Sequence, residues 1–133
     1  MSLLCLATAA MVVAIPASSF TVAWTHSIEK VRWEEDYRIE GLRLHAVEAR
    51  VKGLAVRVEP PAGARLEGGW WHYRPATEYH YELRLARSPY AKDYELCFGG
   101  FCRFLSQLAP VEEGVTRVYP CPQGSVPPAR SAQ

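Results

Sequence analysis

Short runs in which apolar and polar residues alternate dominate this chain and constrain its fold more than any other feature. In the clearest run, Tyr79, Tyr81, Leu83 and Leu85 alternate with polar residues, as in a strand that buries one face. Similar alternation is found at residues 20–26, 33–39, 54–58, 70–74 and 115–119, and less clearly at 42–51, where the spacing also suits a helical turn. Glycine and proline turns separate the runs. The pattern predicts an all-β fold, an antiparallel sandwich or barrel of about 7–9 short strands.

Length and charge narrow the function classes. The chain has 133 residues, of which 49% are hydrophobic and 22% charged, the balance of one globular domain. It is too short for a second large domain. Fifteen Lys and Arg oppose fourteen Asp and Glu, so no field of one sign is available to hold nucleic acid or an acidic membrane surface. An electrostatically driven DNA-binding protein is excluded.

The N-terminal segment is apolar. Residues 1–20 carry no charged side chain, and 3–15 are almost entirely apolar. A helix of that length spans about 20 Å, less than the ~30 Å hydrocarbon core of a membrane. With the small residues at 16–19, this favours a secretory signal peptide over residues 1–19, and hence export to the periplasm or the outer face of the cytoplasmic membrane. An uncleaved anchor helix and a first buried strand are the alternatives.

The rest of the chain divides into two parts. Residues 20–121 are predicted to form a single β-rich domain. Residues 122–133 are rich in proline, serine and glutamine, and we expect a flexible tail there because they offer little apolar surface to bury.

Two cysteines flank a predicted hairpin turn. The Gly-Gly pair at 99–100 joins two strand ends, which places Cys97 opposite Cys102 in the hairpin. Facing residues of this kind come close enough for a disulfide, which we expect here. Free buried thiols and a metal site are the alternatives, although a metal would need further thiolates or histidines nearby. The role of Cys121 stays open.

His26 and Glu35 form the most reactive candidate pair. If strands 20–26 and 33–39 are neighbours, with Phe20 opposite Ile39, both side chains lie on one apolar face beside Trp24. A buried imidazole gains from a carboxylate partner, so the pair is predicted to close one end of the sheet, to bind a ligand or to act in acid–base catalysis. Removing Glu35 should cost about 3–5 kcal/mol. Glu34, of opposite parity, should be exposed.

Other candidate chemistry is weaker. Ser27 adjoins His26, but adjacent side chains in a strand point to opposite faces, so a serine hydrolase geometry is poor. The chain has no G-x-S-x-G, H-E-x-x-H or P-loop motif, and its scattered histidines predict neither a metal site nor a cofactor. Trp70 and Trp71 must face opposite sides of a strand; the outer one is either a contact residue or a cover for the prolines at 60–61.

Six segments together resemble a known family. They are THSIEK (25–30), WEEDYR (33–38), EARVKG (48–53), EPPAGARL (59–66), GWW (69–71) and LCFGGFCR (96–103). In this order they are similar to the motifs of the "domain of unknown function 1850" family. The resemblance implies a small exported bacterial protein, often encoded beside TAXI-type TRAP transporters, with no established activity. Residues 54–58 depart from the glycine-rich stretch expected there.

These observations favour a non-enzymatic exported binding or accessory protein of the cell envelope, with subunits of a TAXI-type TRAP transporter as expected partners. A small hydrolase or lyase using His26 and Glu35, and a purely structural envelope domain, are the alternatives. The candidate polar site consists of His26, Ser27, Glu34, Glu35, Trp70 and Trp71.

Overall fold

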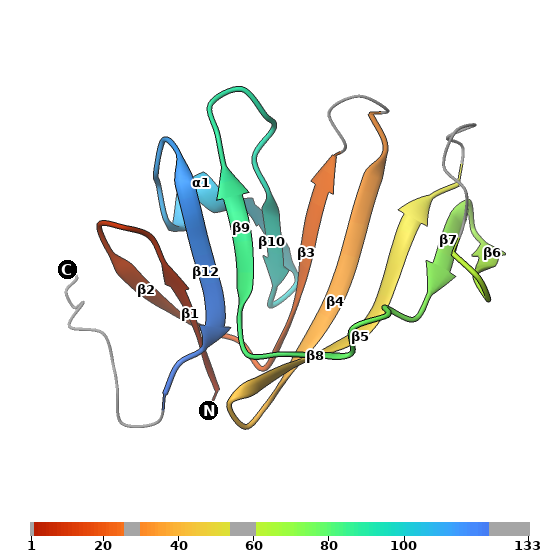
Figure 1. The fold of residues 1–133 in the computed structure, drawn as a ribbon, viewed down its shortest axis with the longest axis horizontal. Helices are drawn as coiled ribbons and strands as arrows, with labels where there is room; N and C mark the ends of the chain where they lie inside the picture. Colours follow the sequence, from red (N-terminus) through yellow and green to blue (C-terminus); the bar gives the residue numbers. More distant parts are fainter. Residues whose placement is uncertain (1, 26–29, 54–60, 123–133) are drawn as a thin grey trace.

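A computed structural model describes residues 2–25, 30–53 and 61–122 and shows two antiparallel sheets (Figure 1). The large sheet contains, in spatial order, β11 (Phe101–Phe104), β10 (Glu95–Phe98), β3 (Ser19–Thr25), β4 (Arg32–Glu40), β5 (Arg43–Lys52), β7 (Trp70–Tyr73) and β6 (Arg65–Glu67), and β8 (Tyr79–His80) pairs with β5. The small sheet contains β2 (Val12–Pro16), β1 (Leu3–Ala7), β12 (Gly114–Pro120) and β9 (Leu83–Arg87).

The predicted all-β, antiparallel class is confirmed, but the sheets do not close into a barrel. Each sheet ends in edge strands, so the two sheets pack as open layers. The described residues form twelve strands, more than predicted, together with one helical turn, α1 (Leu105–Leu108). Within the described ranges, no helix is long and apolar enough to cross a membrane. The predicted strand at 54–58 and residues 123–133 of the predicted tail lie outside the described residues.

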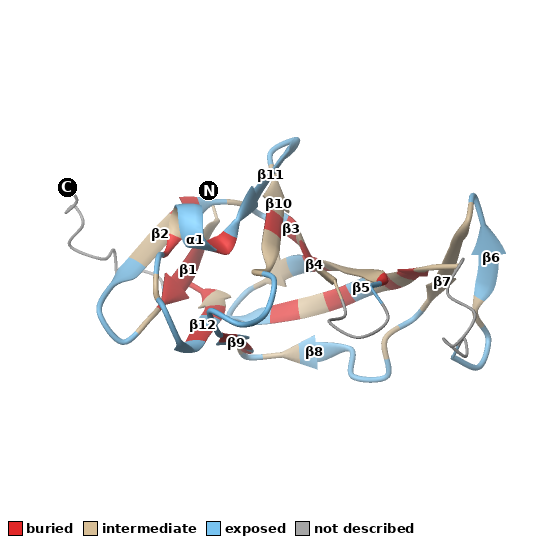
Figure 2. Cartoon of the chain, turned by 90° about the horizontal axis from the view of Figure 1, so that it is seen from above, coloured by how far each residue is buried: buried red, intermediate tan, exposed pale blue. Residues whose placement is uncertain are grey.

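The core lies between the small sheet and the inner face of the large sheet (Figure 2). Its buried side chains are Leu4, Leu6, Ile15, Leu83, Leu85 and Val118 from the small sheet, Phe20, Val22, Tyr37, Leu44, Ala46 and Leu96 from the large sheet, and Leu105 and Ala109 around α1. Fully burying one such aliphatic side chain contributes about 1.5–3 kcal/mol. The large sheet extends past this core toward β6 and β7, as both views show.

The N-terminal segment is a β-hairpin in the structure and not the predicted helix, and its first strand matches the alternative of a first buried strand. β1 pairs with both β2 and β12, so successive residues from Leu4 to Ala7 are at most 4% exposed. A strand buried on both faces is apolar without alternation and therefore has the same composition as a short apolar helix. The hydroxyl of Thr8 accepts hydrogen bonds from the N–H groups of Ala10 and Met11, each at 3.1 Å, and so stabilises the turn. The folded domain thus begins before the predicted boundary at residue 20.

The register of β3 and β4 differs from the prediction by two residues. Phe20 lies opposite Tyr37 instead of Ile39, and Trp24 lies opposite Trp33. A two-residue shift leaves every side chain on the same face, so the predicted antiparallel neighbours and their shared inner face are correct.

A β-bulge explains why residues 42–51 were ambiguous. Asp36 of β4 pairs with Glu48, but the next residue, Tyr37, pairs with Ala46, so Val47 has no partner on β4. Across this bulge the buried positions of β5 change from even numbers to odd, and Ala46 and Ala49 stand three residues apart on one face. That spacing imitates a helical period.

The alternating run at 79–85 forms two strands in different sheets. Residues 79–80 pair with β5 in the large sheet, whereas β9 pairs with β12 in the small sheet. Tyr81, which is 76% exposed, lies where the chain crosses between them.

The structure contains two disulfides, one within a hairpin and one between residues far apart in the sequence. Cys97 pairs with Cys102 as predicted, with Cα atoms 3.9 Å apart, across a turn whose two glycines have φ of 60° and 86°. Both values lie in the left-handed region, which suits a two-residue hairpin turn and favours glycine. Cys121, whose role the sequence left open, pairs with Cys5 at a Cα separation of 5.1 Å and joins β1 to the end of β12.

The two disulfides should differ in their contribution to stability. The Cys5–Cys121 bridge closes a loop of 116 residues and the Cys97–Cys102 bridge a loop of 5. Loop-closure entropy predicts losses of about 5 and about 2 kcal/mol when the respective pairs are replaced by alanine. Urea unfolding of the two double variants, followed by tryptophan fluorescence, measures both. Equal losses would contradict the loop-length argument.

Candidate functional site

The large sheet presents different chemistry on its two faces. Trp33, Glu35 and Tyr37 of β4 lie on the inner face, whereas Glu34 and Asp36 lie on the outer face. Each face has a hollow. The hollow on the inner face is named the inner cleft and the one on the outer face the outer cavity.

The inner cleft lies between the inner face of the large sheet and the segment that carries β8 and β9. It has a volume of about 530 Å³. Its lining residues are Val22, Trp24, Glu35, Tyr37, His80, Glu82, Leu83, Arg84, Leu85 and Tyr94. A volume in this range suits a small organic molecule.

Glu35 is the polar centre of the inner cleft. Its neighbours across the strands are Val22 on β3 and Ala49 on β5, both buried, so apolar groups flank the carboxylate on both sides. The hydroxyl of Tyr37, two residues along β4 on the same face, donates a hydrogen bond to Oε1 of Glu35. Among the described residues, no Lys, Arg or His nitrogen lies within 4.0 Å of this carboxylate.

Aromatic side chains line the inner cleft together with Glu35. Trp24 stacks on Trp33 at a centroid distance of 6.2 Å, and the ring of Tyr94 is tilted by 55° against Trp24 at 6.3 Å. His80 meets Tyr37 edge-on, with centroids 6.1 Å apart. Trp24, Tyr37, His80 and Tyr94 therefore give the inner cleft an aromatic lining, whereas Trp33 packs behind Trp24 and does not line it.

The negative charge of Glu35 acts on three tyrosines. Burial, together with the hydrogen bond to Glu35, raises the pKa of Tyr37. Burial and then Glu35 also raise the pKa of Tyr73, and burial, Asp93 and Glu35 raise that of Tyr94. All three phenols therefore stay protonated at physiological pH and add no further negative charge.

The second carboxylate of the inner cleft is already neutralised. Glu82 accepts hydrogen bonds from Arg84 and Arg117, each at 3.1 Å. The two acids of the cleft therefore differ: arginine holds Glu82, whereas tyrosine holds Glu35.

The outer face carries an ionic network centred on Arg50. Its guanidinium donates to Glu34 at 2.7 Å and to both carboxylate oxygens of Asp36 at 2.8 and 3.0 Å. Arg32 extends the network from Glu34 to Glu95, at 2.7 and 2.6 Å. Glu48 joins it at 3.3 Å from Arg50 and lies 3.0 Å from His72.

Glu34 belongs to this network, which corrects the expectation that it would be exposed. Its side chain is only 16% exposed. Burial alone would raise the pKa of Glu34, but hydrogen bonds from Arg32 and Arg50 outweigh burial and hold the pKa below its ordinary value. The prediction that Glu34 lies on the opposite face from Glu35 is correct. On this sheet, however, the ionic network shields part of the outer face from solvent.

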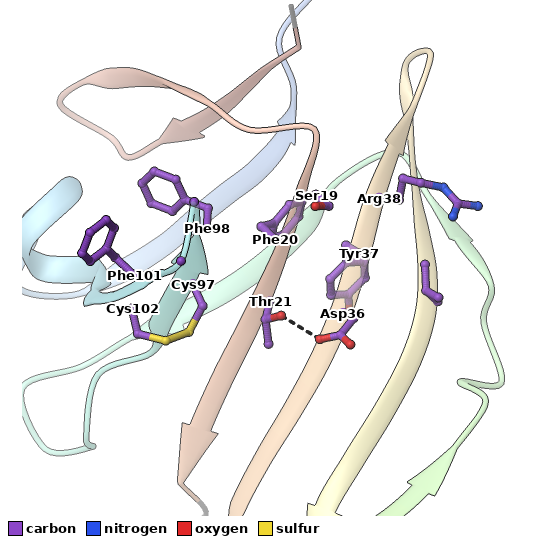
Figure 3. Close-up of a pocket in the computed structure, with 13 residues that line it drawn as sticks. Ser19, Phe20, Thr21, Asp36, Tyr37, Arg38, Cys97, Phe98, Phe101 and Cys102 are labelled. Carbon is purple, nitrogen blue, oxygen red and sulfur yellow. Dashed lines mark hydrogen bonds between the residues drawn. A yellow bond between two sulfur atoms is a disulfide. The ribbon is translucent and has the colours of Figure 1, made fainter.

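The outer cavity lies against the disulfide hairpin and has a volume of about 590 Å³ (Figure 3). β3 and β4 form its floor, where the hydroxyl of Thr21 donates to Asp36 at 2.6 Å. Cys97, Cys102 and the rings of Phe98 and Phe101 form the hairpin side. Since Thr21 and Arg50 already satisfy Asp36, this cavity offers no uncompensated charge, and the inner cleft is the better candidate site.

The structure separates the two tryptophans of the predicted polar site from Glu34 and Glu35. His26 and Ser27 lie outside the described residues, so the expected pair of His26 with Glu35 stays a prediction. Trp70 and Trp71 lie on β7 and pair with Lys52 and Val51 of β5, so β5 separates them from β4. The ammonium of Lys52 lies 4.9 Å from the ring centre of Trp70.

Sequence reasoning missed Tyr94, Tyr73 and His80 as neighbours of the site. Tyr37 shares the parity of Glu35 and could have been found by the same count that selected Glu35. Tyr94 lies between β9 and β10 in a segment without periodicity, and nothing local marks it. Within the described residues, no group of three or more His, Cys, Asp or Glu side chains could hold a metal ion.

The fold and the inner cleft together define a small all-β domain with an acidic, aromatic hollow at the edge of its core. The chain belongs to the family described as Domain of unknown function (DUF1850), whose model matches residues 20–105. The matched range includes Glu35, the outer-face network and the Cys97–Cys102 hairpin. Neither the curated proteins nor the solved structures contain a match.

The ionic network should make stability depend on pH through Glu34. Because folding lowers the pKa of Glu34 from its ordinary 4.5, the stabilisation is complete above that value and is lost as the pH falls through the lower pKa of the folded state. Glu34→Gln should cost about 1–2 kcal/mol at pH 7, a value reduced for partial exposure, and less at pH 3. Urea unfolding at both pH values measures the difference.

The matched control is Glu112→Gln, because Glu112 lies exposed in the turn before β12. This variant should leave stability unchanged at both pH values. A Glu34→Gln variant that is as stable as the control at pH 7 would contradict the structural role of the network.

Proposed function

We propose that this protein is a non-enzymatic binding module of the cell envelope that holds a small solute in its inner cleft. The observation that carries the proposal is the setting of Glu35: a partly buried carboxylate between apolar side chains, held by Tyr37 and faced by aromatic rings. A carboxylate in such surroundings is costly unless a partner compensates it. A bound solute provides that partner.

The inner cleft has the general composition of a solute site. Leu83, Leu85 and Val22 supply apolar surface, while Glu35 and the tyrosine hydroxyls supply a few polar groups that can orient a ligand. Most of these groups lie on β3, β4 and β9, whereas Tyr94 lies in the segment before β10. Binding therefore requires little rearrangement of the backbone.

The disulfides support an envelope location. All four cysteines are paired, in two bridges. Disulfides persist in oxidising compartments such as the bacterial periplasm and are rare in the cytosol. Taken with the family resemblance, this favours an exported accessory protein that works beside the subunits of a TAXI-type TRAP transporter.

Solute binding can be tested with tryptophan fluorescence, because Trp24 lines the inner cleft and stacks on Trp33. Representative ammonium compounds, carboxylates and sugars are titrated against the oxidised full chain. At least one class should change the emission saturably, and isothermal titration calorimetry should show that Trp24→Leu, which removes the reporter ring, weakens binding of that ligand at least about tenfold. The bound compound should be recovered unchanged.

Three outcomes would oppose the proposal. Failure of every class to bind would remove the binding function. Binding that Trp24→Leu does not affect would place the solute elsewhere. Recovery of a chemically altered compound would indicate an enzyme, and the hydrolase or lyase hypothesis would then replace this one.

The transporter partnership needs a separate measurement. The exported chain is crosslinked in cells that also express the membrane subunits and the substrate-binding protein of a TAXI-type TRAP transporter. Crosslinks to one of these named subunits, located by mass spectrometry, are expected. Their absence, with the transporter present and functional, would contradict the partnership and leave the binding function untouched.

A further inference from the structure

We infer that the ligand of the inner cleft carries an organic ammonium group, which lies against Glu35 and the surrounding aromatic rings. This inference rests on the proposed binding function and specifies the class of ligand. It draws on the charge of the cleft, its ring faces and its size.

The charge of the cleft favours a cation. Glu82 is held by two arginines at 3.1 Å, and on the outer face Asp36 is held by Arg50 at 2.8 and 3.0 Å. Glu35 differs from both, since the partner shown for it among the described residues is the neutral hydroxyl of Tyr37. The three protonated tyrosines nearby leave Glu35 as the group that sets the sign of the field on the large-sheet side of the cleft. An anionic solute would be repelled there.

The ring faces favour an organic cation over a metal ion. A cation over an aromatic face is attracted by the negative charge of the π system, and the attraction increases when the site excludes water. Trp24 and Tyr94 both line the cleft, with ring centroids 6.3 Å apart, and so supply aromatic surface beside a bound cation. A metal ion would instead need several oxygen or nitrogen ligands, and the described residues contain no group of three.

The dimensions fit a small compound. The volume of about 530 Å³ lies within the range for small-molecule sites. Beside Glu35, the position on β5 is occupied by Ala49, whose methyl group leaves space above the sheet. Leu83 and Leu85 on the opposite side can cover the methyl or methylene groups that surround an ammonium nitrogen.

Choline and its neutral analogue 3,3-dimethyl-1-butanol provide the direct test, because the two differ by one atom and one charge. Isothermal titration calorimetry on the oxidised full chain, at constant chloride, should show saturable choline binding at least about tenfold tighter than that of the analogue. Glu35→Gln should weaken choline binding at least about tenfold while keeping an oxygen that accepts from Tyr37.

Glu112→Gln is the matched control. It removes an exposed carboxylate in the turn before β12, which does not line the inner cleft, so choline affinity should change less than about twofold. Thermal melts establish that both variants are folded. Equal affinity for choline and the neutral analogue, or equal loss in the two variants, would overturn the ammonium inference.

The outcomes separate this inference from the proposed function. If choline does not bind but a neutral or anionic solute does, and Trp24→Leu weakens that solute, the ammonium inference is wrong and the binding function stands. If no solute of any class binds, both fail.

A second inference, carried by different observations, concerns processing. We propose that residues 3–16 are retained in the oxidised protein and are not removed as a leader. Cleavage at residues 16–19 would take away β1 and β2, uncover the core around Leu83, Leu85 and Val118, and leave Cys121 without Cys5.

Mass spectrometry of the protein recovered from the envelope fraction tests retention. A non-reducing digest should contain one peptide pair linked through Cys5 and Cys121, and Cys121 should resist alkylation before reduction. A mature chain that starts after residue 16, or a freely alkylated Cys121 in folded protein, would overturn the inference.

Discussion

The position of β1 between β2 and β12 is the constraint on which the rest of the molecule depends. This strand holds the small sheet together, and its leucines cover the inner face of the large sheet. β12 in turn positions β9, and β9 supplies Leu83 and Leu85 to the inner cleft. The first strand of the chain therefore determines where one wall of the candidate site stands, although none of its residues lines that site.

Strand β4 shows how one segment can present two electrostatic environments. Toward the outside, alternate acids meet arginines from β4 and β5 and form a compensated network. Toward the inside, Glu35 stands among aromatic and aliphatic groups with a tyrosine as its donor. The outer network costs little to maintain because each charge has a partner. The inner carboxylate has a neutral donor among the described residues, so a cationic ligand is the partner that would compensate its charge.

Periodicity in the sequence was sufficient to assign most strands and the face of each residue, but not their exact pairing. Face depends on parity, which survives a two-residue shift, and so Phe20, Trp24 and Glu35 were placed on one face although their partners were wrong. The bulge at Val47 changes the buried positions of β5 from even to odd residue numbers, and no local sequence pattern predicts where this happens. The disulfide at Cys97 and Cys102 was predictable because a Gly-Gly turn determines its register. The bridge from Cys5 to Cys121 was not, because only the tertiary fold brings the two ends together.

The site was predictable to a similar, limited degree. Glu35 follows from strand parity, and Tyr37 could have followed from the same count. Tyr94 and His80 reach the cleft from the segments around β9, whose paths depend on the crossing between sheets near Tyr81. The prediction for Glu34 was wrong because a residue on the face opposite to the core was assumed to be exposed to solvent. Neighbouring strands contribute Arg50 to that face, and single-strand patterns contain no information about such partners.

The pairing of the first strand with the last has a consequence for the order of folding. β3, β4 and β5 are consecutive hairpins, and contacts between neighbours in sequence form quickly. The second edge of β1, in contrast, can pair only after residues 117–120 of β12 are present. Until the chain has been synthesised almost to its end, the leucines of β1 stay uncovered. The apolar face of the sheet formed by β3, β4 and β5 is then also open to solvent. The slow, aggregation-sensitive phase of folding should therefore be the closure of the small sheet, after the strands that carry Glu35 have already formed.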